Sequence, residues 1–160
     1  MDHAALFLAG LWSGLFAIAL GLLLTAPVRY LLPTFVCGFA GRFCHDLLAD
    51  LGMSRDWATV AASILVVLIA AVIIRHRQVS PVVLICAILP LGSALAIFNS
   101  IFYLMRISTL EGDDLASASV ALNANLGKAF TGTLAIAVGV AAGLGLIRLF
   151  VNERDAISDA

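Results

Sequence analysis

Three ionisable residues inside an apolar stretch are the part of the sequence best suited to chemistry. Arg42, His45 and Asp46 lie at positions i, i+3 and i+4, so on a helix they share one face. Counted from Tyr30, Arg42 lies about 18 Å along a helix axis, past the middle of a hydrocarbon core about 30 Å thick. Ionisable groups at that depth are costly unless they pair or line water. Arg42 is therefore a candidate substrate-binding residue, and His45 or Asp46 a candidate for proton coupling.

Two structural interpretations of this polar face stay open. Arg42 and Asp46 have the spacing of a simple i, i+4 salt bridge within one helix. Alternatively, the helix ends near Gly41, which would leave the three residues at the membrane interface. The residue types are compatible with both interpretations and with a place in a transport path.

A proline within a later apolar run marks a second candidate site. Pro90 removes a backbone donor and clashes with the carbonyl of Cys86, which loosens a helix near mid-membrane. Transporters expose half-helix dipoles to substrate at such breaks, although proline kinks also occur in membrane helices without a binding site. The residues of this region that we expect to contact substrate are Pro90, Gly92, Ser93 and Asn99.

These candidate residues must be positioned by apolar segments long enough to cross a bilayer. The expected spans are residues 4–26, 30–49, 57–74, 79–103 and 126–150, and residues 108–125 form a polar outer connection between the last two. The sequence therefore predicts an all-α fold, a polytopic transmembrane helical bundle of about five spans. A single transmembrane domain then covers residues 1–160.

The composition excludes several classes of protein. The chain is 62% hydrophobic and 12% charged, with a mean hydropathy of +1.10, which a soluble domain could not bury. A net charge of -1 gives no basic patch for nucleic acid. The sequence has no nucleophile–base pair, nucleotide loop or metal-ligand spacing. We therefore expect no enzyme activity, no cofactor and no metal site.

Small residues recur every four positions in the last apolar run and form two stripes. One comprises Gly127, Thr131, Ala135, Gly139 and Gly143, and the other Ala129, Thr133, Ala137, Ala141 and Gly145. A shorter stripe in the first run comprises Gly10, Gly14, Ala17 and Gly21. Such stripes let helix backbones approach closely in lipid. Two close-packing faces on so small a protein predict a partner subunit or self-association.

The order of several short segments resembles the bacterial threonine/serine exporter family, and more closely its small-subunit branch. These segments are Ala26-Pro27-Val28-Arg29, Gly41 with Arg42 and His45, Gly52 with Asp56-Trp57-Ala58-Thr59, Ala61-Ala62-Ser63, Pro90, and Arg106 before Ile107-Ser108. Family members often carry a second proline followed by glycine where this chain has Ser93-Ala94, so the kink here should be softer.

The resemblance implies a transporter of the bacterial inner membrane that works with a larger membrane subunit of the same family. It implies export of threonine- and serine-type amino acids, or of small dicarboxylates such as succinate, driven by the proton gradient. A different class of function also fits the sequence, a non-transporting assembly subunit whose polar face contacts the larger chain.

The distribution of arginines predicts the orientation of the chain. Five spans place on one side Arg29, Arg75, Arg77, Arg148 and Arg154. Positively charged loops stay in the cytoplasm, so the N-terminus should lie outside and the C-terminus inside. A cysteine placed after Asn152 should react with an impermeant maleimide only from the cytoplasmic side, and one at Gly112 only from outside. The reverse labelling pattern in cells and inverted vesicles would overturn this orientation.

Overall fold

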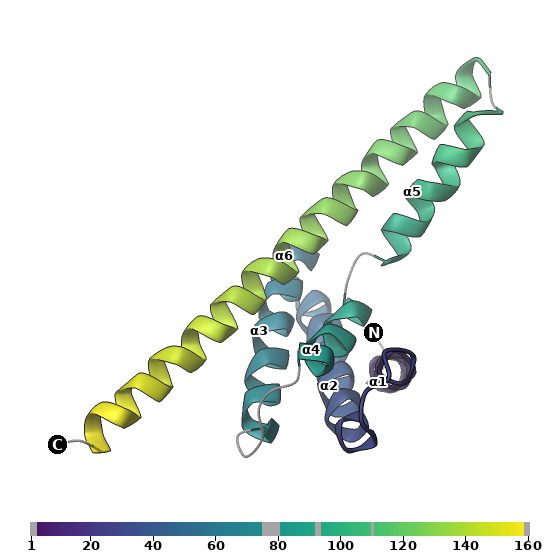
Figure 1. The fold of residues 1–160 in the computed structure, drawn as a ribbon. Helices are drawn as coiled ribbons and strands as arrows, with labels where there is room; N and C mark the ends of the chain where they lie inside the picture. Colours follow the sequence, from purple (N-terminus) through teal and green to yellow (C-terminus); the bar gives the residue numbers. More distant parts are fainter. Residues whose placement is uncertain (1–2, 75–80, 92–93, 110, 159–160) are drawn as a thin grey trace. The chain divides into compact units, whose positions relative to one another are not determined.

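The chain is all-helical in the residues that the computed structural model describes, which are 3–74, 81–91, 94–109 and 111–158. The helices are α1 (His3–Leu23), η1 (Val28–Tyr30), α2 (Leu31–Asp50), α3 (Arg55–Ile74), α4 (Pro81–Ile88), η2 (Leu89–Leu91), α5 (Ala94–Ile107) and α6 (Asp113–Ser158) (Figure 1). The helices divide into two compact units, the first of residues 1–91 and 135–160 and the second of residues 92–134.

Among the described residues, three helices are long and apolar enough to cross a membrane, namely α1, α3 and α6. The pair α4 and α5 adds a fourth span if the two helices count as one broken span. The predicted polytopic all-α bundle is thereby confirmed. The helix α2 has 20 residues but carries Arg42, His45 and Asp46, which make it more polar than the three spans.

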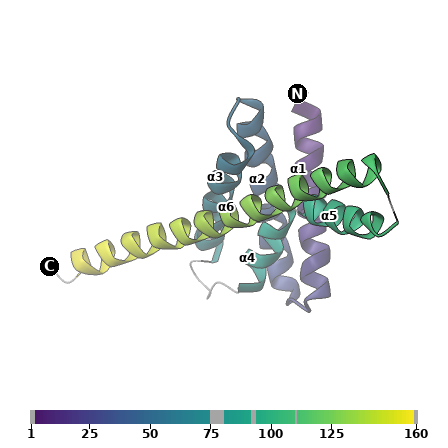
Figure 2. The ribbon, with the colours of Figure 1, turned by 90° about the horizontal axis from the view of Figure 1, so that it is seen from above.

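In the first unit, α2 lies between α1 and α3 (Figures 1 and 2). The contact with α1 is close because glycines face it: a Cβ on Gly14 would lie 2.7 Å from the Phe35 ring, and one on Gly38 would lie 2.8 Å from the Cβ of Ala17. The Ser13 hydroxyl donates a hydrogen bond of 3.0 Å to the carbonyl of Gly38 across this interface. The predicted small-residue stripe of the first helix therefore packs against α2.

On its other side, α2 shares a buried core with α3, α4 and η2. The residues of this core are Cys37, Ala62, Val66, Ala70, Val83, Ala87 and Leu91. Most of them are small or β-branched, so the helices approach closely without long side chains between them. The three cysteines are free, and Cys37 and Cys86 are buried.

The C-terminal part of α6 packs on α3 through one of its two predicted stripes. A Cβ on Gly139 would lie 2.6 Å from the Cβ of Ser63 and 2.7 Å from the carbonyl oxygen of Val60. One turn later, a Cβ on Gly143 would lie 2.9 Å from the Cβ of Val67. The second stripe is half-buried at Ala129 and exposed at its four other residues, and a Cβ on Gly145 would meet nothing within 4 Å.

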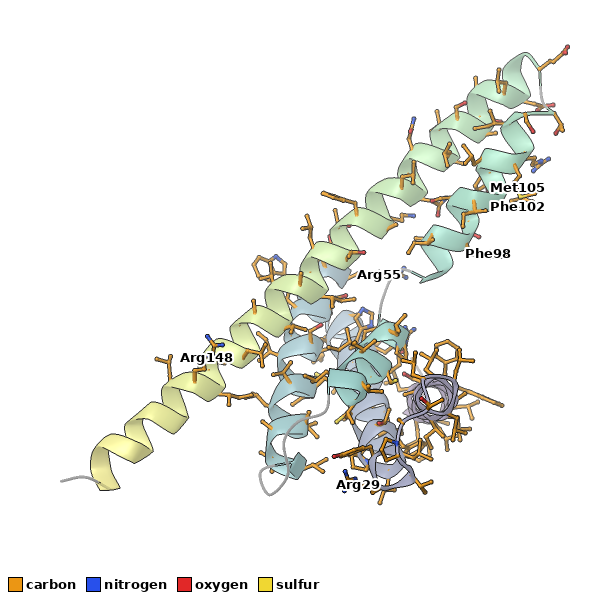
Figure 3. The ribbon with its side chains drawn as sticks, viewed as in Figure 1. Arg29, Arg55, Phe98, Phe102, Met105 and Arg148 are labelled. Carbon is orange, nitrogen blue, oxygen red and sulfur yellow. The ribbon has the colours of Figure 1, made fainter. Side chains whose placement is uncertain are left out.

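The second unit is a hairpin of α5 and the first part of α6, which run side by side (Figures 1 and 2). The interval 108–125, expected to be a polar connection, is mostly helical because α6 begins at Asp113. On α5, Phe98, Phe102 and Met105 recur at helical spacing and are exposed on the side away from α6 (Figure 3). An exposed apolar face of this kind is suited to lipid.

We predict that Gly139→Leu destabilises the first unit, because a larger side chain would push the backbones of α3 and α6 apart. Overpacking of this kind costs about 1–3 kcal/mol. The matched control is Gly145→Leu on the same helix, where the new side chain has open space and leucine favours helix more than glycine does. The measurement is the thermal unfolding temperature in detergent. Equal unfolding temperatures for the two variants would show that this stripe does not hold α6 to α3.

Candidate functional site

The helix α2 continues without a break through the polar cluster and ends at Asp50. Its end is set by Gly52, whose φ of +92° is a conformation that glycine adopts without strain. The amide of Gly52 donates to the carbonyl of Ala49, and that of Met53 donates to the carbonyl of Leu48, as expected at a glycine-terminated helix end. The interpretation that the helix stops near Gly41 is therefore wrong.

Asp46 lies at the centre of the cluster and bonds to both of the other residues. Its Oδ2 accepts a hydrogen bond of 2.8 Å from Nε of Arg42, and its Oδ1 accepts one of 2.8 Å from Nδ1 of His45. The side chains of His45 and Asp46 are each 12% exposed, whereas that of Arg42 is 36% exposed. The carboxylate is thus the buried hub of the cluster, and the guanidinium lies at its edge.

The guanidinium of Arg42 contacts Asp46 through only one of its nitrogens. Among the residues that the structure describes, Asp46 is the one hydrogen-bonding partner of this side chain. The two terminal nitrogens therefore keep their donors for another group. Because the donors of a guanidinium match the two oxygens of a carboxylate, this edge is suited to an anionic ligand. The salt bridge and anion binding are thus compatible, although sequence reasoning treated them as alternatives.

The turn around Pro90 packs against α2 immediately before the polar cluster. A Cβ on Gly41 would lie 2.6 Å from Cγ2 of Val66 on α3 and 3.2 Å from Cδ1 of Leu91 at the end of η2. Gly41 precedes Arg42 in the chain, so the turn that contains Pro90 is a neighbour of the polar cluster within the first unit. Sequence reasoning did not include Gly41 or Leu91 in the site, and the available signal was the spacing of Gly38 and Gly41 on one face of α2.

The structure shows an interruption at Pro90 and leaves the other residues predicted for this region as predictions. The helix α4 ends at Ile88, the turn η2 covers Leu89–Leu91, and α5 begins at Ala94. Gly92 and Ser93 lie outside the described residues. Asn99 is half-buried on α5 in the second unit. A role in substrate binding stays a prediction for all four residues.

Within the described part of the chain, no group of three His, Cys, Asp or Glu side chains could hold a metal ion. The cluster on α2 has only one carboxylate and one imidazole, and that carboxylate is already bonded to Arg42 and His45. The guanidinium of the cluster has donors that suit an anion, and its carboxylate and imidazole are groups that can exchange a proton.

Comparison with protein families decides the kind of protein. The family described as Threonine/Serine exporter, ThrE matches the chain over residues 9–150. The chain belongs to the threonine/serine exporter family. The match includes α2, η2 and α3, and so every residue of the cluster and its packing contacts. Neither the curated proteins nor the solved structures contain a significant match.

Membership of the exporter family agrees with the helices described above. The family is one of transporters, and the apolar helices α1, α3 and α6 can cross a bilayer. The chain is therefore a multi-pass membrane protein of the threonine/serine exporter type.

For this exporter-family chain, we predict that Asp46→Ala lowers stability more than His45→Ala does. Removal of Asp46 leaves two side chains without their partner, whereas removal of His45 leaves Arg42 and Asp46 paired. The loss for Asp46→Ala should be about 2 kcal/mol, between the values for exposed and buried ion pairs. The measurement is thermal unfolding in detergent, with Asp46→Asn as the conservative control. A larger loss for His45→Ala would contradict the central place given to Asp46.

Proposed function

We propose that this exporter-family protein carries small carboxylate-bearing metabolites out of the cell and that Arg42 meets the substrate carboxylate. The candidate substrates are threonine- and serine-type amino acids and small dicarboxylates such as succinate. The observation that carries the proposal is the guanidinium of Arg42. Its Nε lies 2.8 Å from Oδ2 of Asp46, while its terminal nitrogens keep donors for a second anion.

The shared position of Asp46 supports a proposal for how protonation of this carboxylate is linked to substrate binding. Asp46 and a substrate carboxylate are two anions that attract the same guanidinium. A proton on Asp46 neutralises its carboxylate, so the guanidinium of Arg42 can pair with the substrate carboxylate instead. Loss of that proton restores the Arg42–Asp46 pair and favours release of the substrate. His45, bonded to Oδ1 of the same carboxylate, is placed to pass this proton.

The exposed surface of α6 supports the proposal that the chain works with a larger membrane subunit of the same family. In an apolar window of 18 residues within α6 only 17% of the residues are buried, against 33% in the corresponding window of α1 and 39% in that of α3. A stripe of small residues has no evident use against lipid, whereas it lets a second helix approach closely. Self-association would use the same surface.

The orientation and location complete the proposal. We place the chain in the bacterial inner membrane with its N-terminus outside and its C-terminus in the cytoplasm. Arg29 precedes α2 and Arg55 begins α3, so the two arginines lie at opposite ends of α2 (Figure 3). The cytoplasmic side is then the one that contains Arg29.

A non-transporting assembly subunit is the second candidate function, and the exposed stripe on α6 favours it. On this view, the partly exposed edge of Arg42 contacts an acidic group of the larger subunit. The two candidates differ in what happens when the charges of the cluster are removed together.

We predict that Arg42→Gln leaves the protein in the membrane and lowers efflux of a carboxylate substrate at least tenfold. The charge that binds the anion is lost, and the amide of glutamine remains available to Asp46. The double variant Arg42→Gln with Asp46→Asn should assemble normally and still fail to export. The measurement is efflux from proteoliposomes, with and without the larger subunit, alongside the amount of protein in the membrane.

The outcome that contradicts substrate binding is recovery of efflux in the double variant. A neutral pair satisfies the fold but cannot hold an anion, so recovery would leave only the structural salt bridge. Loss of complex formation with the larger subunit, combined with normal protein levels, would instead support the assembly function.

A further inference from the structure

We propose that Gly41 is a positioning residue for the exporter, because the turn η2 after α4 packs against Gly41 directly beside Arg42. The inference rests on the proposed function of Arg42. Gly41 is buried, and three elements meet at it, namely α2 itself, α3 through Val66 and η2 through Leu91.

The distances show that only a glycine fits at this position. A Cβ on residue 41 would lie 2.6 Å from Cγ2 of Val66, and 3.2 Å and 3.7 Å from the two terminal carbons of Leu91. Val66 is fully buried and β-branched, so its side chain has little freedom to move aside. A side chain at position 41 would therefore move α2, α3 and η2 apart.

The same contact determines where the break lies relative to the anion-binding edge. Leu91 is the last residue of η2 and is 5% exposed, so it anchors the end of the turn in the core. Arg42 follows Gly41 directly, and its guanidinium is partly exposed. When Leu91 packs on Gly41, the turn that contains Pro90 is therefore held against the residue that precedes Arg42. Displacement of this turn changes the surroundings of Arg42 without removing any group that bonds to substrate.

The chain offers a matched control for this contact. Gly38 lies one turn earlier on α2 and is also buried, but a Cβ there would meet Ala17 of α1 at 2.8 Å, and its three nearest atoms all belong to α1. Gly38→Ala and Gly41→Ala therefore introduce the same methyl group with comparable crowding on different neighbours. The two variants share any gain in helix propensity over glycine.

The first experiment measures efflux kinetics in proteoliposomes. Gly41→Ala should raise the KM for the carboxylate substrate about five- to tenfold, and Gly38→Ala should keep the KM of the parent even if less protein assembles. An equal change of KM in both variants would overturn the inference, because crowding anywhere on α2 would then suffice. An unchanged KM in Gly41→Ala would overturn it as well.

The second variant keeps the test decisive if Gly41→Ala folds poorly. Gly41→Ala with Val66→Ala removes the contact at 2.6 Å and leaves the one with Leu91 at 3.2 Å. A KM still above that of the parent supports the proposed packing of η2 on Gly41. A KM equal to that of the parent assigns the effect to α3 and overturns the role of the break.

The last measurement does not depend on transport. Cys86 is fully buried on α4, directly before the break. In a background with Cys37→Ala and Cys44→Ala, a membrane-permeant maleimide should label Cys86 at least several-fold faster in Gly41→Ala than in Gly38→Ala. Equal labelling rates would overturn the proposal that Gly41 holds η2 in place. A parent protein that exports no carboxylate would overturn the proposed function alone, because the labelling rates still decide whether Gly41 holds the break.

Discussion

Close approach of helix backbones is the constraint on which the first unit depends. Inside a bilayer, apolar side chains gain little by leaving lipid, so helices are held together by dispersion and by hydrogen bonds at short range. Several positions at the interfaces are accordingly glycines, where an added Cβ would collide with a neighbouring helix. Gly14 and Gly38 serve the contact between α1 and α2, and Gly41 and Gly139 serve the contacts with α3. The bond from Ser13 to the carbonyl of Gly38 is possible only because the backbones are this close.

The same constraint explains how a charged helix is accommodated among apolar ones. The helix α2 contacts α1 on one side and α3, α4 and η2 on the other. On its polar face, the side chains of His45 and Asp46 are accordingly only 12% exposed. Asp46 bonds to both Arg42 and His45, so these three side chains are paired within one helix. What remains exposed is the outer edge of one guanidinium, and the proposed transport chemistry uses that edge.

The helix α6 follows the same packing rules on the face that meets α3, and the residues 133, 137, 141 and 145 of its other stripe are exposed. Gly139 and Gly143 of one stripe meet α3, whereas a Cβ on Gly145 of the other stripe would meet nothing within 4 Å. Two stripes of similar composition thus have different surroundings. The comparison indicates that small residues make close packing possible but do not by themselves determine which face is used.

The sequence by itself determined the all-α class, the polar face of α2 and the interruption at Pro90, because hydropathy, helical spacing and the missing proline donor are local properties. It did not predict that α6 begins at Asp113. The helix accommodates the polar residues there because their side chains bond to carbonyls of the same helix, as Ser119 does to Leu115 and Asn125 to Ala121.

Other features were decided only by the tertiary structure. The contact of Leu91 with Gly41 joins residues far apart in the chain, so spacing along one helix could not reveal it. The same holds for the choice between the two stripes of α6, since it depends on where α3 lies. The double role of Asp46 required the rotamers of its neighbours, which are set by packing around α2 and not by the order of residues.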